Sequence, residues 1–240
     1  MFTVALIGPD GAGKTTVARL LERKLGLPAK YLYMGVNLES SGVMLPTTRL
    51  VLALKRARGG RSDMVAASDT ERDPGAAGPM SRARRELKAA LRMANWIGEE
   101  WFRQALASYH RRRGKIVIFD RHFLADYHAY DVINSGRGRP LANRLHGLLL
   151  RRVYPRPDLV IYLDAPAAVL LARKGEGTLE SLERRRSEYL ETAGLAPAFA
   201  LVDVDRPLDA VVGDVARLVR RFHQQRRRGR RAVAASARQR

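Results

Sequence analysis

The feature that most constrains this chain is a glycine-rich run near its start, Gly8-Pro9-Asp10-Gly11-Ala12-Gly13-Lys14-Thr15, directly after the apolar stretch 2–7. It fits the pattern G-x-x-x-x-G-K-[ST], in which a loop joins a strand to a helix. Glycines let successive backbone N–H groups point inward, and the positive end of the following helix attracts anions. An amphipathic helix is expected next, with apolar positions Val17, Leu20, Leu21 and Leu25. The sequence therefore predicts a phosphate site at a strand-to-helix junction.

The residue types in this run also indicate the ligand. Lys14 is expected to reach the terminal phosphates of a nucleoside triphosphate as a compact charge, and the Thr15 hydroxyl to ligate the accompanying Mg²⁺. The predicted cofactors are ATP and Mg²⁺. A plain glycine-rich turn is the competing interpretation, which the strand before it and the helix after it disfavour. The expected nucleotide contacts in the run are Gly8, Asp10, Gly11, Ala12, Gly13, Lys14, Thr15 and Thr16.

Short apolar runs alternate with helical patterns along most of the chain. This alternation is typical of an α/β fold with a parallel sheet and helices on both faces, because parallel strands need crossover connections. We expect a single domain over residues 1–222. The five expected strands are 2–7, 31–34, 116–119, 159–163 and 199–204.

The segments between the strands differ in character. A helix is expected from Thr47 to Gly59-Gly60, and residues 59–79 are expected to form a mobile insert because they lack an apolar period. The longest helical pattern covers 81–113 and offers a face for a homodimer. A further helix is predicted over 141–153.

Composition excludes several classes of protein. The 240 residues are 46% hydrophobic, as in globular proteins, and include no cysteine, so disulfides and thiol catalysis are excluded. No apolar stretch is long enough to span a bilayer, and the start lacks the basic region of a signal peptide. We expect a cytoplasmic protein.

The net charge of +20 is concentrated near one end. Ten arginines and no acidic residue lie between positions 217 and 240, which is half of the excess. Residues 223–240 are expected to form a basic, disordered tail. Contact of this tail with nucleic acid or with an anionic membrane remains open beside a purely solvated role.

Two further strand ends carry candidate chemistry. The strand 116–119 is followed by Asp120 and Arg121, at the sheet edge where ligands bind in such folds. Asp120 is expected to hold Mg²⁺ or to accept a proton, and Arg121 to clamp a phosphate. Asp164, after the next strand, is expected to cap the following helix.

A basic segment broken by glycines covers residues 173–187 and includes Arg173, Lys174 and the run 184–186. A closing lid needs this composition, because it must move and must bring cations to the phosphates. A charge run can equally be a solvated helix face. The segment as a whole is the lid hypothesis, with Arg173 as its candidate catalytic residue.

Together these residues resemble the thymidylate kinase family, a nucleoside monophosphate kinase branch of the phosphate-loop enzymes. The resemblance extends from residue 2 to about residue 220, in the expected order. Its matching pieces are Gly8 to Thr16, Gly114 to His122, Tyr162 to Pro166 and Asp205 to Leu208.

The resemblance implies a three-layer P-loop kinase fold with a basic lid and the transfer of the ATP γ-phosphate to a small acceptor. It implies that Asp10 contacts the acceptor sugar, that Asp120 and Arg121 serve catalysis and acceptor binding, and that lid arginines supply charge because Ala12 is not basic. Arg206 belongs to the loop that it places beside adenine. The implied catalytic residues are Lys14, Asp120, Arg121 and Arg173, and the implied metal ligands are Thr15 and Asp120.

The chain departs from the family pattern on the acceptor side. Ala129-Tyr130 comes one residue late, the insert 59–79 falls where the family is compact, and Glu99 lies where an arginine would recognise thymine. Trp96 and Trp101 nearby suit either the core or stacking on a base. The acceptor is left open among dTMP, another nucleotide and a sugar-type alcohol. The alternative function is a nucleic-acid or anionic-surface binding protein with a regulatory nucleotide site.

Overall fold

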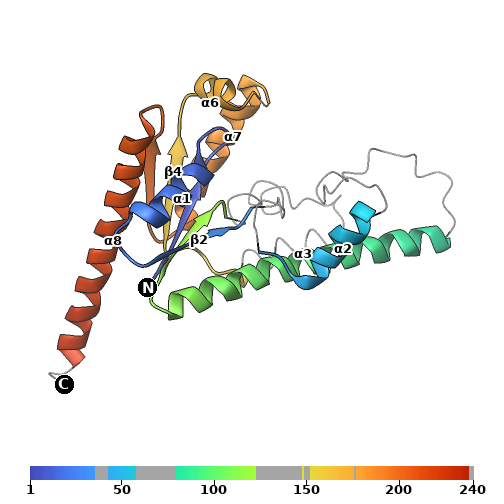
Figure 1. Cartoon of the computed structure of the whole chain (residues 1–240), viewed down its shortest axis with the longest axis horizontal. Coiled ribbons are helices and arrows are strands. Elements are labelled where there is room, and N and C mark those ends of the chain that lie inside the picture. Colours follow the sequence, from blue (N-terminus) through green and yellow to red (C-terminus); the bar gives the residue numbers. More distant parts are fainter. Residues whose placement is uncertain (36–42, 58–78, 123–147, 149–151, 176, 238–240) are drawn as a thin grey trace.

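A computed structural model describes residues 1–35, 43–57, 79–122, 148, 152–175 and 177–237. It contains a five-stranded, all-parallel sheet in the order β2-β3-β1-β4-β5, with helices on both faces (Figure 1). The predicted α/β class and five-stranded parallel sheet are therefore confirmed. The strands are β1 (Thr3–Ile7), β2 (Ala29–Tyr33), β3 (Ile116–Asp120), β4 (Leu159–Asp164) and β5 (Phe199–Asp203).

The centre of the sheet is β1, which lies between β3 and β4. Leu6 is in register with Asp120 on one side and with Ile161 on the other. Because all five strands run in the same direction, the segments that follow β1, β3 and β4 begin at the same edge. The boundary of β2 differs from the prediction: it begins at Ala29, two residues before Tyr31, since residues 29–33 pair continuously with 116–120.

One face of the sheet is covered by α1 (Lys14–Lys24) and α8 (Leu208–Ala237) (Figure 1). Alternate residues of the strands point into this layer, as the two-residue period of a strand requires. Its fully buried members include Val4, Leu6 and Ile118 from the strands, Leu21 from α1 and Val215 from α8.

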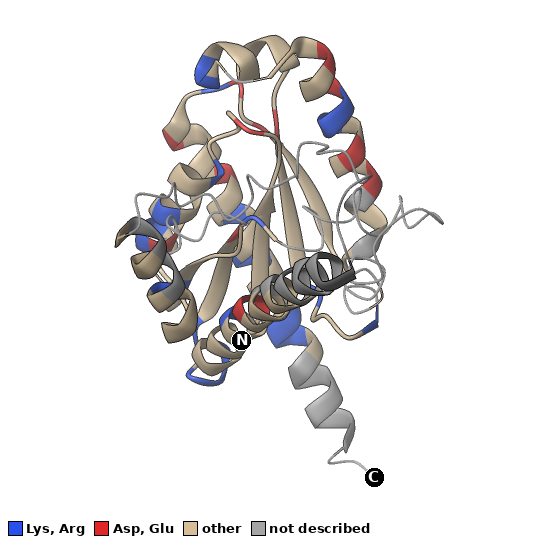
Figure 2. Cartoon of the chain, turned by 90° about the vertical axis from the view of Figure 1, so that its right-hand side faces the viewer, with Lys and Arg blue, Asp and Glu red and all other residues tan. Residues whose placement is uncertain are grey.

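The other face is covered by α3 (Pro79–Arg112) and α7 (Leu179–Glu191), and Figure 2 shows α3 crossing the strands. Ile7, Phe119 and Tyr162 are buried here together with Ala107 of α3. The helix α2 (Pro46–Ala57) lies along α3, where Asn95 Nδ2 donates to the Thr48 hydroxyl. Leu50, Leu54 and Leu91 on α2 and α3 are exposed, and the homodimer stays a prediction.

The basic tail is corrected by the structure. Residues 223–237, expected to be disordered, continue α8 as a helix. The physical reason is twofold. Arginine, glutamine and alanine favour helices, and the middle of α8, from which residues 227–237 continue, is anchored to Phe2: the rings of Phe222 and Phe2 meet edge to face at 5.0 Å, and Arg226 stacks over both.

The anchor extends to β1 through one carboxylate. Asp158 accepts hydrogen bonds from the Thr3 N–H at 2.8 Å and from the Thr3 hydroxyl, and it also pairs with Arg226. Burial raises the pKa of Asp158, but the hydrogen bonds from Arg226 and Thr3 and the Arg226 charge outweigh it and hold the pKa below its usual value. The middle of α8 is thus joined to the first strand.

Two predictions fall on residues that the structure leaves undescribed. The insert 59–79 lies outside the described residues except at position 79, which begins α3, and the predicted helix 141–153 lies mostly outside them. In the part of the chain that is described, no helix has the length and apolar character needed to cross a membrane.

Candidate functional site

The phosphate loop begins after Ile7 and leads into α1 at Lys14. Gly8, Gly11 and Gly13 all have positive φ angles, of 147°, 89° and 76°. A Cβ on Gly8 would lie 2.4 Å from the carbonyl oxygen of Leu163, and one on Gly11 would lie 2.6 Å from that of Leu170. Glycine is required at these two positions for two reasons. The φ angles are positive, and β4 and the next helix pack so closely against the loop that a Cβ would collide with their backbone.

Lys14 is nearly buried, with 5% of its surface exposed, and folds back over the loop. Its ammonium donates to the carbonyl oxygens of Gly8 and Pro9, both at 2.7 Å. Thr15 and Thr16 follow in the first turn of α1, where both are exposed and where no acidic residue lies. The first turn therefore presents hydroxyl groups and helix N–H groups in a positive field, which suits an anion.

Asp120 ends β3 and is completely buried. Its Oδ2 accepts a hydrogen bond of 3.0 Å from the Tyr31 hydroxyl on β2, while its Oδ1 has no hydrogen-bond partner in the described part of the chain. Burial and then the Asp120 charge raise the pKa of Tyr31, which keeps the phenol a donor. A buried carboxylate oxygen without a partner is costly, so a cation or donor at this position would be stabilising.

These residues fit the Mg²⁺ that accompanies a nucleoside triphosphate. Among the described residues no group of three acidic or histidine side chains could hold a metal by itself. Mg²⁺ at nucleotide sites needs few protein ligands, because phosphates and water supply the others. Thr15, with its exposed hydroxyl, and Asp120, with its unsatisfied oxygen, are the candidate protein groups.

Arg121 has the strained backbone expected of a functional residue. Its φ is 70°, which is uncommon for a side chain larger than glycine. The turn is held by the Arg121 N–H, which donates to Leu6 O at 3.0 Å, and by close packing of the side chain on Gly35, where a Cβ would lie 2.5 Å from Arg121 Cδ. This turn directs the guanidinium to Asp10 of the phosphate loop, with Nη2 donating to Oδ1 at 2.8 Å.

Four basic side chains from three parts of the chain converge on the Asp10 carboxylate. Besides Arg121, the nitrogens of Lys14, Lys174 and Arg185 lie 3.9, 3.7 and 3.3 Å from its oxygens. Burial raises the pKa of Asp10, but the charges of Lys14, Arg121 and Lys174 outweigh it and lower the pKa to about 2. Asp10 is therefore always ionised near neutral pH, and the cluster carries a surplus of positive charge.

Lys174 and Arg185 reach the loop from two helices, α6 (Ala167–Lys174), whose charged residues are all basic, and α7, which carries residues of both signs (Figure 2). Gly175 ends α6 in the left-handed conformation, with φ of 68°. Arg186 of α7 then binds Asp164 at the end of β4 through two hydrogen bonds of 2.8 Å. This bidentate pair holds the helices over the edge of the sheet.

The predicted capping role of Asp164 is wrong. The N-cap of α6 is Pro166, with no side-chain hydrogen bond, and the helix begins at Ala167. Asp164 is the last residue of β4, and its carboxylate accepts bonds from the Tyr162 hydroxyl at 2.9 Å and from Arg186. These two donors use the oxygens that a cap would need.

Two other predicted site residues lie apart from the cluster. Arg173 donates to Val204 O at 3.0 Å and lies 3.9 Å from Asp205, so it contacts the loop after β5. Arg206 turns toward α8, where it donates to Asp214 at 2.8 Å and to Asp203 O. Among the described residues neither side chain forms a hydrogen bond or ion pair with residues 8–15.

Two residues of the site have no individual role predicted from the sequence, Tyr31 beside Asp120 and Lys174 in the Asp10 cluster. The sequence pattern indicates only that Tyr31 belongs to a strand. Its register with Ile118, two residues before Asp120, places both side chains on the same face, and this register was the missing signal. Lys174 directly follows Arg173, the residue that was predicted to act from the lid. A shift of one position along the helix decides which of the two side chains faces the loop.

Glu99 lies where the family resemblance places an arginine that recognises thymine, and the structure shows its contacts. Glu99 is buried and accepts a bond of 2.8 Å from Leu45 N, and Arg103 one turn later donates to Gly35 O at 2.9 Å. Glu99 and Arg103 thus join α3 to Leu45 and to Gly35, the glycine on which the Arg121 side chain packs. Trp101 packs against Tyr154 at a ring separation of 5.7 Å, and the Trp96 side chain lies outside the described residues.

The loop geometry predicts different costs for two glycine substitutions. Gly11→Ala and Gly13→Ala both place a side chain in the left-handed region, which costs roughly 1–2 kcal/mol. A Cβ at Gly13 meets no atom within 4 Å, whereas at Gly11 it meets Leu170 O. In urea unfolding, Gly11→Ala should therefore be less stable than Gly13→Ala by at least ~1 kcal/mol. Equal stabilities would show that the loop is not pressed against α6.

The lowered pKa of Asp10 predicts a pH dependence of stability. Because the pKa falls from 3.8 unfolded to about 2 folded, its contribution is complete above pH 4 and is lost as pH falls toward 2. The stability advantage of the natural chain over Asp10→Asn should shrink across that window in urea titrations. Asp209→Asn, which changes an exposed carboxylate, is the control and should show a smaller change. A pH-independent advantage of Asp10 would contradict the assignment.

Comparison of the sequence with models of known protein families gives no match. The assignment of a function therefore depends on the geometry of the site. Three features of that geometry bear on it: a glycine loop at a helix start, a buried carboxylate with an unsatisfied oxygen, and cations gathered on Asp10.

Proposed function

We propose that this protein is an ATP- and Mg²⁺-dependent phosphotransferase with a P-loop kinase fold and a basic lid. The observation that carries the proposal is the convergence of Lys14, Arg121, Lys174 and Arg185 on Asp10 inside the glycine loop. A phosphoryl group in transfer spreads negative charge over its oxygens, and enzymes stabilise it mainly by positioned cations and N–H groups. The cluster supplies such groups from the loop, a strand end and two helices.

The donor half of the site consists of the loop and the start of α1. Backbone N–H groups of the loop would bind the β- and γ-phosphates, and Lys14 would exchange its bonds with Gly8 O and Pro9 O for phosphate oxygens. Mg²⁺, when bound, neutralises charge on the phosphates, and Thr15 and Asp120 would hold it. The short side chain of Ala12 provides no cation, so the charge must come from elsewhere.

The helices α6 and α7 would act as the lid that provides this charge. Lys174 and Arg185 are near Asp10 already, and the Arg186–Asp164 pair keeps the helices in place. A closed lid excludes water, which would otherwise compete for the γ-phosphate. Because Arg173 is turned to the loop after β5, we assign the lid's cationic role to Lys174 and Arg185 in its place.

The acceptor half of the site is built on Asp10 and Arg121. A carboxylate with a pKa near 2 is a poor general base but a good acceptor of hydrogen bonds, so Asp10 would orient a hydroxyl of the acceptor. Arg121 would clamp an acceptor phosphate. The acceptor class is a nucleoside monophosphate, dTMP or similar, or a related sugar-type alcohol. A phosphate-transfer screen with ATP across nucleoside monophosphates, nucleosides and sugars tests this, and no product from any acceptor would refute it.

Substitution of Lys14 tests the donor site. Lys14→Ala removes a charge next to the transferred group, and turnover should fall at least ~100-fold, as for loss of one preorganised stabilising group. Lys24→Ala, at the far end of the same helix, removes an exposed lysine paired with Asp209 and should leave turnover nearly unchanged. Steady-state kinetics with the acceptor found in the screen gives both values. A Lys14→Ala variant as active as the natural chain would contradict the proposal.

A pair of neighbouring arginines tests the lid. Arg185 lies 3.3 Å from Asp10, whereas Arg184 is exposed and forms no ion pair within 4.0 Å among the described residues. Arg185→Ala should lower kcat by about 10-fold or more, and Arg184→Ala by much less, although both remove the same charge. Equal losses would indicate a general field effect and not a specific contact.

A further inference from the structure

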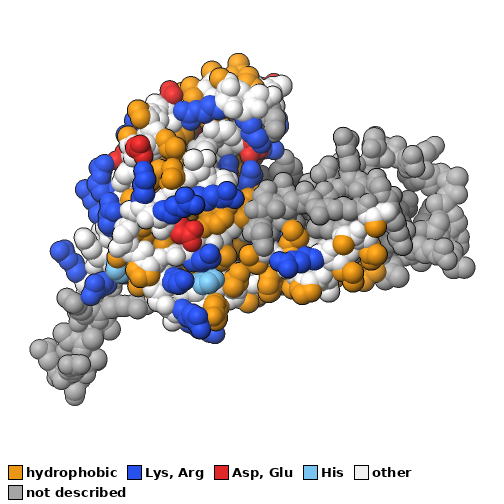
Figure 3. Space-filling view, in the orientation of Figure 1, with side chains coloured by type: hydrophobic (Ala, Val, Ile, Leu, Met, Phe, Trp, Pro, Cys, Tyr) orange, Lys and Arg blue, Asp and Glu red, His pale blue; other side chains and the backbone are white. Residues whose placement is uncertain are grey.

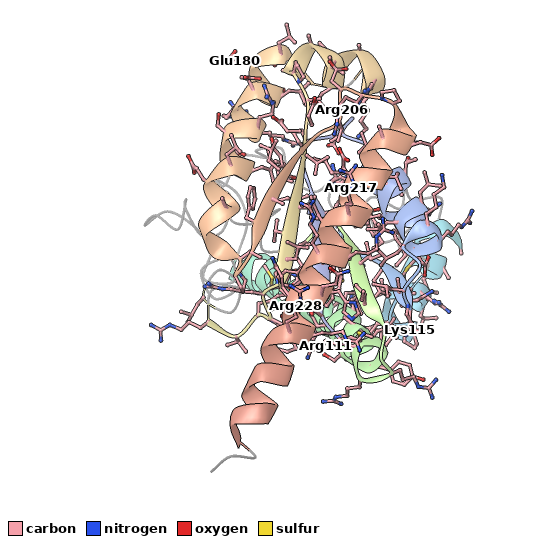
Figure 4. All side chains as sticks on the ribbon, turned by 90° about the vertical axis from the view of Figure 1, so that its left-hand side faces the viewer. Arg111, Lys115, Glu180, Arg206, Arg217 and Arg228 are labelled. Carbon is pink, nitrogen blue, oxygen red and sulfur yellow. The ribbon has the colours of Figure 1, made fainter. Side chains whose placement is uncertain are left out.

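The exposed side of α8 carries a regular row of polar side chains. Arg217, Arg221, Gln224 and Arg228 are spaced by four, three and four residues, which places them on one stripe of the helix. All four are exposed. Figure 4 shows Arg217 and Arg228 along the same helix, with Arg206 beyond its start. We name these four residues the α8 track.

The charge of the α8 track is largely uncompensated. Arg217 pairs with Asp214, which also binds Arg206, but Arg221 and Arg228 have no ion pair within the described residues. From position 215 to position 237 the sequence contains no acidic residue. The space-filling view shows basic side chains recurring on the side of the molecule that α8 occupies (Figure 3). An anion along this helix would meet cations with little competition from carboxylates.

The length of the track suits a linear polyanion. At 1.5 Å per residue, the distance from Arg217 to Arg228 along the axis is about 16 Å, with a donor at every turn. A small anion would use only one of these positions, whereas a chain of phosphates can use them all. The start of the track opens into a hollow between β5 and α8, where Arg206, Arg217 and Arg221 lie together with the carboxylates of Asp203 and Asp214.

The residue types at the exposed positions of α8 favour nucleic acid over a membrane surface as the ligand. A helix that binds a bilayer inserts large apolar side chains beside its cations. Between 209 and 229 the exposed residues of α8 are only Asp, Ala, Arg, Gln and Gly. They include no aromatic side chain on which a base could stack, so contacts would be to the backbone and independent of sequence.

We propose that the α8 track binds the phosphate backbone of nucleic acid. This binding is additional to phosphoryl transfer and does not depend on it, because no member of the track belongs to the Asp10 cluster. Contacts of arginine to phosphate release counterions, so the affinity should fall steeply with salt. The anchor residue Arg226 is not part of the track, since it holds α8 to Asp158 and Phe2.

The test uses the full chain and a fluorescein-labelled oligothymidine, with binding followed by anisotropy between about 50 and 200 mM salt. The variant is Arg217→Ala/Arg221→Ala/Arg228→Ala, which keeps strong helix formers in α8. Its affinity at low salt should fall at least ~10-fold, and the slope of log K against log salt should decrease by about 2, for three lost contacts.

The matched control is Arg23→Ala/Arg49→Ala/Arg152→Ala, which removes the same charge from exposed positions outside α8. It should keep most of the affinity and the slope. Equal loss in both variants would refute a specific track, as would absence of binding by the natural chain at low salt. Binding to vesicles containing phosphatidylserine but not to the oligonucleotide would also overturn the proposal. Unchanged urea midpoints of both variants, measured beside binding, separate these results from unfolding.

Discussion

The shared direction of β3, β1 and β4 is the constraint on which the candidate site depends. Because β1 lies between the other two, the phosphate loop, the Asp120-Arg121 turn and Asp164 all begin at one edge of the sheet. No single element could bring these groups together, since they lie more than a hundred and fifty residues apart in sequence at the extremes. The buried strands thus fix the positions of side chains that themselves contribute little to the core.

The electrostatics of the edge follow from this arrangement. Four cations surround the Asp10 carboxylate and leave a net positive charge at this edge. The cations are held together by this carboxylate, which belongs to the protein itself. Asp10 therefore assembles the cationic groups within the protein itself, and under the proposed function this lowers the reorganisation that phosphate binding would require. The Arg186–Asp164 pair has a similar effect one strand away, because it fixes α7 to β4 through a contact made entirely within the protein.

The sequence predicted the sheet well and the side-chain partners less well. Continuous apolar runs located all five strands, and the glycine pattern located the loop, because burial and left-handed turns restrict residue type strongly. The choice of Arg173 over Lys174, the cap at Asp164 and the role of Tyr31 depended on helix rotation and strand register, which composition does not encode. The disorder expected after residue 222 failed for another reason: the contacts that order α8 come from Phe2, Thr3 and Asp158, far away in sequence.

The anchoring of α8 to the first strand has a consequence for how the chain folds during synthesis. Phe2 becomes buried only when Phe222 and Arg226 pack on it. The strand β1 also needs both β3 and β4 as hydrogen-bonded neighbours. In chain order β1 comes before β3 and β4, and α8 follows all of them, so the central strand is synthesised before the elements that pack on it. A nascent chain therefore keeps an apolar strand unpaired until those later elements have been made, which is when such a strand is most exposed to aggregation.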